Sequence, residues 1–181
     1  MQKFDIQMAL VPLFLSAIAE AAPVDVSGTV HVAGIVKSSH EENCSVALTS
    51  PAVTLHGTQL DDLGYMTEHV DHYSADTVGI SLSGNACNRN NVGFKFVGGT
   101  VSGNINAVSN SLNGNDAAQG VGIGLYYFGE QITPNTEIVN FVNDPSVGST
   151  MPVSIKLFKM RGMEPTAGKF QTSVTVQLER L

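Results

Sequence analysis

The stretch APVDVSGTVHVAGIV, residues 22–36, alternates strictly between apolar and polar positions. One face carries Val24, Val26, Gly28, Val30 and Val32, and the other carries Asp25, Ser27, Thr29 and His31. This period of two predicts a β-strand with one face to be buried. Gly28, in the middle of the apolar face, marks a place where another chain segment comes close. We therefore expect this strand to lie against a partner surface.

Length and composition predict one all-β domain. The chain has 181 residues, 18 of them Gly, no Trp, and only 14% charged residues, which is typical of a fold with many turns and against a helical bundle. The formal net charge is -7, and the nine Lys and Arg residues are scattered. This charge distribution argues against nucleic acid as a partner and against a basic membrane-binding patch.

The same alternation returns along the rest of the chain. It is found in residues 45–55, where Pro51 divides two short strands, and in residues 75–84, 92–98, 118–129, 151–160 and 168–181. In residues 118–129, Val121, Ile123, Leu125 and Tyr127 are predicted to point inward. Residues 98–116 are rich in Asn and Gly, which favours loops or irregular edges. Short strands separated by Gly, Asn and Pro turns predict a β-sandwich or barrel.

Residues 1–21 have the composition of a signal peptide. Lys3 precedes an apolar run from Met8 to Ala19, and Ala19-Glu20-Ala21 fits the small-x-small cleavage rule. The apolar run is too short to cross a bilayer as a helix. Export to an oxidising compartment makes a disulfide between Cys44 and Cys87 the expected state of the only two cysteines.

Three patterns raise the question of an enzyme or metal site. His69 and His72 are three residues apart with His56 nearby, but they lie in a polar connection where solvated histidines are common. The run GVGIGLYYFG at residues 120–129 alternates like a strand and has no following helix, unlike a dinucleotide-binding loop. The chain has no Gly-x-Ser-x-Gly motif. We expect no catalytic residue, no metal and no cofactor.

The order of these features resembles the pilins of chaperone-usher fimbriae, the type 1 and P-pilus-like subunits of Gram-negative bacteria. The resemblance is carried by GTVHVAGIV at 28–36, the first cysteine, ISLSGNAC at 80–87, VGFKFVG at 92–98, GVGIGLYYFGEQI at 120–132 and a last alternating strand preceded by AGKF at 167–170. It covers the chain that remains after the signal peptide. No single motif is diagnostic, so the resemblance lies in their combined order.

The resemblance implies an incomplete immunoglobulin-like β-sandwich, which lacks its last strand and is completed by a donor strand from another subunit. Its domains would be a signal peptide at 1–21, a donor-strand extension at 22–32 and a pilin domain at 33–181. The donor strand would present Ala22, Val24, Val26, Gly28 and Val30 to a neighbour's groove. Main-chain hydrogen bonds would give general affinity, and alternate side chains would set the register.

The resemblance also implies partners and a location. They are other pilin subunits, a periplasmic chaperone and an outer-membrane usher, with export through the periplasm to the fimbria at the cell surface and no direct membrane insertion. The groove edge, which also binds the chaperone, would be formed by Phe170, Val174, Val176 and Leu178. The chain ends QLERL, with Leu178 where the family has an aromatic residue and Arg180 in the penultimate place.

Three alternatives remain open at this point. Residues 24–32 would be an ordinary first strand if the sandwich is complete in itself. The protein would then be a soluble secreted immunoglobulin-like or lectin-like binding module; another binding role is that of a fimbrial tip adhesin. A third class is a small secreted metalloenzyme that uses His56, His69 and His72.

Overall fold

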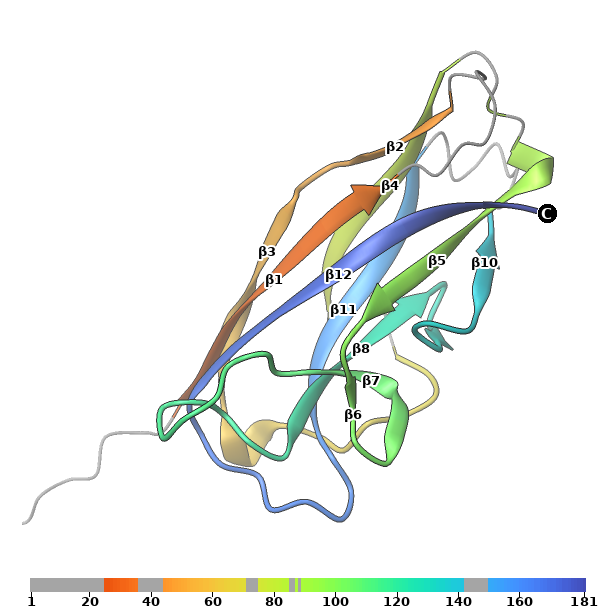
Figure 1. Ribbon diagram of the computed structural model, residues 1–181. Helices are drawn as coiled ribbons and strands as arrows, with labels where there is room; N and C mark the ends of the chain where they lie inside the picture. The colour runs from red at the N-terminus through yellow and green to blue at the C-terminus, as the bar shows by residue number, and fades with distance from the viewer. Residues whose placement is uncertain (1–24, 36–43, 71–74, 85–86, 88, 142–149) are drawn as a thin grey trace, which may run out of the picture.

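The chain folds into two β-sheets that pack face to face (Figure 1). The computed structural model describes residues 25–35, 44–70, 75–84, 87, 89–141 and 150–181. The first sheet has the order β10 (Ile138–Asn140), β5 (Val92–Gly98), β12 (Lys169–Arg180), β1 (Asp25–Ile35) and β3 (Ala52–Gln59). The predicted all-β fold is confirmed.

The second sheet faces the first across the core. Its order is β2 (Ser45–Leu48), β4 (Asp76–Ser83), β11 (Thr150–Lys159), β8 (Val121–Tyr127), β7 (Asn104–Ser109) and β6 (Thr100–Val101), with β9 (Glu130–Ile132) also paired to β8. The helical elements in the described chain are two short 3-10 turns, η1 (Leu60–Asp62) and η3 (Arg89–Asn91). Within these ranges, no helix is long and apolar enough to cross a membrane.

Alternating side chains from both sheets build the main core. In β12, Phe170, Val174 and Val176 are buried while Gln171 and Ser173 are exposed, as a strand with one apolar face requires. Ile123 and Leu125 of β8 meet them from the other sheet. The strands predicted from the alternation therefore exist, and their apolar faces point inward.

The Asn- and Gly-rich segment 98–116 is more regular than a simple loop. Its first part forms the β6–β7 hairpin at the edge of the second sheet. Ala107 and Val108 of β7 are consecutive and both fully buried, although they point to opposite faces. Val108 joins the main core and Ala107 joins a second apolar cluster on the outer face of the sheet. Burial on both faces hides the alternation that identifies a half-buried strand.

Residues 64–70, here called the strap, cover that outer face. The second cluster consists of Val70, Val101, Ala107, Tyr126, Phe158 and Met160, with Met66 packed against it. The sequence pattern placed Tyr127 inward, and Tyr127 is partly buried against the main core. Its neighbour Tyr126 is fully buried on the opposite face because the strap lies over it.

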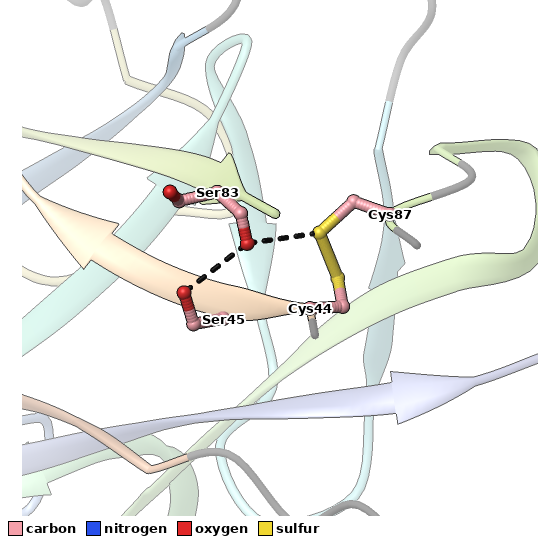
Figure 2. The surroundings of a disulfide bond; sticks show 4 residues. All are labelled: Cys44, Ser45, Ser83 and Cys87. Atoms are coloured by element: carbon pink, nitrogen blue, oxygen red, sulfur yellow. Dashed lines mark hydrogen bonds between the residues drawn. A yellow bond between two sulfur atoms is a disulfide. The ribbon is translucent and has the colours of Figure 1, made fainter. Parts of the chain in front are cut away.

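A disulfide joins Cys44 and Cys87, as predicted, with 4.9 Å between their Cα atoms. Figure 2 shows how it links the segments next to β2 and β4, which are neighbours in the second sheet. Beside it, the Ser45 hydroxyl donates a hydrogen bond of 3.1 Å to the carbonyl oxygen of Ser83. That oxygen also lies 3.2 Å from Sγ of Cys87. The disulfide therefore reinforces one corner of the sandwich.

Candidate functional site

The N-terminal strand β1 lies inside the first sheet, between β3 and β12 (Figure 1). It runs parallel to β12, with Ser27 opposite Lys169 and Ile35 opposite Gln177. It runs antiparallel to β3, with His31 opposite Ala52. Both backbone edges of β1 are therefore paired within the same chain.

The apolar face of β1 enters the core. Val30 is 0% exposed and Val32 is 6% exposed, whereas His31 between them is exposed. Burial of each valine stabilises the fold by roughly 1.5 to 2 kcal/mol. The two valines thus fill the space between β3 and β12 and face the second sheet.

Gly28 lies where the contact between β1 and β12 is tightest. A Cβ atom at this position would lie 2.7 Å from the carbonyl oxygen of Phe170 and 2.8 Å from its Cβ. Phe170 is 1% exposed and is the register partner of Gly28. Only glycine allows the two backbones this approach, because any side chain would collide with β12 itself.

The walls on either side of β1 come from β12 and β3. The predicted groove residues Phe170, Val174, Val176 and Leu178 are all buried along the inner face of β12. In β3, Val53 and Leu55 are buried on the opposite side of β1. The alternation in the segment 52–55 would have indicated this second wall.

One polar residue interrupts the inner face of β12. Thr172 is 2% exposed and lies in register with Val30. It was not among the predicted groove residues, although it occupies the same inward register. A hydroxyl in an apolar groove carries a desolvation cost that a valine would not have. Thr172 therefore makes this wall less apolar than the strand pattern alone implies.

The packing beneath β1 is incomplete. A small cavity of ≈ 10 Å³ is lined only by apolar side chains, among them Val32 of β1, Val174 of β12 and Ile155 of β11. A cavity with no polar lining stays dry. The groove therefore has room for a slightly larger guest residue at the level of Val32.

Other predicted donor positions lie outside what the structure describes. Residues 1–24, which include Ala22, Val24 and the predicted signal peptide, are not among the described residues. Val26 belongs to β1 and pairs with Thr58, but its side chain is outside the described part. Gly28 and Val30 are the donor positions that the structure describes in full.

The histidines considered for a metal site are not brought together in the described chain. His69 Nδ1 lies 3.2 Å from Glu130 Oε1 in an exposed pair. His72 and the side chain of His56 are outside the described part. Among the described residues, no three His, Cys, Asp or Glu side chains gather as a metal-binding group. Residues 121–127 of the glycine-containing run form strand β8.

The strap contrasts with β1 in how it is held. The hydroxyl of Tyr126 donates a hydrogen bond of 2.8 Å to the carbonyl oxygen of Thr67. Burial raises the pKa of Tyr126 to about 12, although hydrogen bonds to Thr67 and Gln131 partly oppose the rise. The strap backbone also pairs with β9, since the amide of Gln131 donates to Glu68 and that of Val70 donates to Gly129.

Comparison with known proteins places this geometry in a family. A crystal structure of the P pilus rod subunit PapA superposes with a TM-score of 0.50 at 13% sequence identity, covering 80% of this chain and 97% of that one. At this identity the likeness shows a shared fold. No curated protein sequence matches the chain.

The family model of the fimbrial proteins matches residues 25–179, which span β1 and nearly all of β12. This match bears out the predicted pilin resemblance, and with it a role as a subunit of an extracellular fimbria that associates with other pilin subunits. The chain belongs to the fimbrial protein family.

Proposed function

We propose that the protein polymerises into a fimbria by donor-strand exchange, in which β1 of one subunit fills the groove between β3 and β12 of the next. The observation that carries the proposal is the central position of β1 in the first sheet. Without β1, the buried faces of β3 and β12 would be separated by an open groove that reaches the core. A strand from another subunit would then be needed to complete the sandwich.

The position of β1 means that its withdrawal leaves β10, β5 and β12 paired, and that only β3 loses its strand partner in the described first sheet. β1 is the first strand of the described chain, and the two strands that pair with it, β3 and β12, both follow it in sequence. Withdrawing it breaks the ladders with β3 and β12 but leaves β12 paired with β5. Exchange of an identical element between copies is a low-cost route to assembly.

The groove places little restriction on the direction of its guest. β1 is parallel to β12 and antiparallel to β3, so β3 and β12 run in opposite directions. Any strand between them forms one parallel and one antiparallel ladder, whichever way it runs. Backbone pairing therefore suits a strand from the chain itself, a neighbouring subunit or a chaperone, and side-chain fit must select among them.

In this proposal, residues 1–21 direct export, residues 22–32 are the donor segment and residues 33–181 form the pilin domain. A periplasmic chaperone would lend a strand to the groove, and an outer-membrane usher would be the site of exchange on the way to the cell surface. Phe170, Val174, Val176 and Leu178 would form the wall that the chaperone strand meets.

Deletion of residues 22–32 tests the proposal. The truncated chain, co-expressed with its chaperone, should remain chaperone-bound but form no fibres, because it has no strand to donate. Fibre formation is scored by electron microscopy and by the ladder of polymers on a gel without boiling. The matched control, His31→Ala in the full chain, changes only an exposed side chain of β1 and should polymerise normally. Polymerisation of the truncated chain at the normal rate would refute the assignment of β1 as donor.

A second candidate function is a soluble secreted binding module with a complete immunoglobulin-like sandwich. The self-paired position of β1 favours it, because the described first sheet has no empty place beside β12. The two functions differ in whether β1 leaves its own chain. A full chain that stays monomeric in the presence of its chaperone and usher would favour the binding module.

A further inference from the structure

One chain has two mutually exclusive uses for the same strand. Val30 and Val32 are buried in their own sandwich, so a chain in this closed form has no strand to give and no groove to offer. We infer that the closed form is a resting monomer that does not polymerise until β1 is released. The inference rests on the proposed function, because closure matters to assembly only if β1 is exchanged.

The closed form is well built. The pairing with β12 continues in register from Ser27 to Ile35, and Gly28 removes the side chain that would collide with Phe170. The polar residue His31 points to solvent, so insertion buries no charge at that position. Nothing in the fully described part of β1 would expel it from the groove.

Insertion of β1 into its own sandwich is also favoured over insertion into another subunit by its higher effective concentration. A strand attached to its own sandwich is present at an effective concentration on the order of mM, far above the concentration at which separate subunits meet. If insertion within a chain and between chains is comparably strong, an unoccupied groove closes on its own β1 first. A chaperone strand in the groove would therefore keep subunits competent by preventing closure, besides covering the exposed core.

The register gives a direct test. Thr29 is the register partner of Gln171, and Gln171 is exposed on the outer face of the first sheet. Paired neighbouring strands lie about 4.8 Å apart, within the Cα separation that a disulfide spans. The double variant Thr29→Cys with Gln171→Cys should crosslink within one chain when the monomer, purified without chaperone, is oxidised. The native cysteines do not interfere, because both are already in a disulfide.

Two further pairs make the test specific. His31→Cys with Ser173→Cys uses the next outward register position and covers the case in which the first pair fails to fold. Thr29→Cys with Gln177→Cys is the matched control, because residue 177 lies opposite Ile35, roughly 20 Å along the strand. Intrachain and interchain links are distinguished by gel mobility and by mass spectrometry of the linked peptides.

The expected result is an intrachain link in the first two pairs but not in the control, with at least tenfold slower polymerisation of the linked monomer than of the same variant before oxidation. Absence of the intrachain link from both test pairs would overturn the inference, as would equal polymerisation rates before and after linking. These outcomes are separable from failure of the proposed function. If the deletion of residues 22–32 abolishes polymerisation but no intrachain link forms, the results support donor-strand exchange and contradict the existence of the closed monomer.

Discussion

The strand β1 and the strap at residues 64–70 both cover apolar surface, but they are held in different ways. β1 is held by two backbone ladders and by valine side chains that enter the core. The strap is fixed by short stretches of backbone pairing with β9 and with Lys159 of β11, and by the hydrogen bond from the Tyr126 hydroxyl to the carbonyl oxygen of Thr67. The continuous backbone ladders of β1 can be formed by any equivalent strand. The strap has only short stretches of backbone pairing and also depends on one specific side-chain hydrogen bond, so we expect it to stay in place.

The largest effect is expected from Val30→Asp. Val30 is 0% exposed, so the substitution buries an unpaired carboxylate between the sheets. We expect the free energy of unfolding of the closed monomer to fall by at least about 3 kcal/mol. Urea denaturation measures the loss, and His31→Asp, on the exposed face, serves as the control. Equal effects of the two variants would show that β1 is not inserted in the sandwich.

Gly28→Val should follow in size. The new Cβ would lie 2.7 Å from the carbonyl oxygen of Phe170, so the two strands must separate at a cost of about 1 to 3 kcal/mol. Gly64→Ala is the matched control in the strap, because a Cβ there meets no atom within 4 Å. Thermal unfolding compares the two. A Gly28→Val chain as stable as the wild type would contradict the conclusion that the contact between β1 and β12 requires glycine at this position.

Tyr126→Phe tests how the strap is held. It removes the hydroxyl that bonds Thr67 and leaves that carbonyl oxygen without its partner, at a cost of about 1 to 2 kcal/mol. Hydrogen exchange should increase in the strap and remain unchanged in β1. Faster exchange in both segments would contradict their independence.

The same tyrosine gives the strap a pH dependence. Burial raises the pKa of Tyr126 from 10.0 to about 12, so folding favours the neutral hydroxyl. The contribution of the neutral Tyr126 hydroxyl to the free energy of unfolding is complete below pH 10 and is lost as the pH rises through 12. The total loss is on the order of 2 kcal/mol. Urea denaturation of the wild type and of Tyr126→Phe between pH 9 and about 12 isolates this contribution. Parallel pH curves for the two proteins would contradict the buried, neutral tyrosine.

The smallest effect concerns Val32→Ile. The added methyl group points toward the cavity of ≈ 10 Å³ beside Val32 and should stabilise the closed monomer by up to about 0.8 kcal/mol. Val46→Ile, in a partly buried position of β2 away from this cavity, is the control. A destabilised Val32→Ile chain would mean that the groove is already filled to capacity at this level.

Much of the fold could be predicted from sequence because its strands keep one face in water. The alternation in residues 168–181 and 75–84 predicted both the strands and their buried faces. The oxidising compartment inferred from residues 1–21 predicted the disulfide between Cys44 and Cys87. The resemblance carried by motif order gave the family. These predictions depend on local patterns that tertiary contacts did not override.

The rest depends on contacts between distant segments. Tyr126 is buried because residues 64–70 cross over it, and no periodicity near either segment indicates that meeting. The pattern of residues 22–36 showed which face of the strand is apolar but not whose groove it fills, since self-pairing and donation bury the same residues. The position of β1 beside β12 of its own chain is therefore information that only the fold provides.

Fibres assembled from a mixture of full-length chains and tagged chains that lack residues 22–32 test the central claim most directly. A truncated chain can receive a donor strand but cannot give one, so we predict that gold particles against its tag label a single tip of a fibre, at most one subunit per fibre. Tagged full-length chains, as the control, should label the whole length. Truncated chains incorporated along the shaft would contradict assembly through β1.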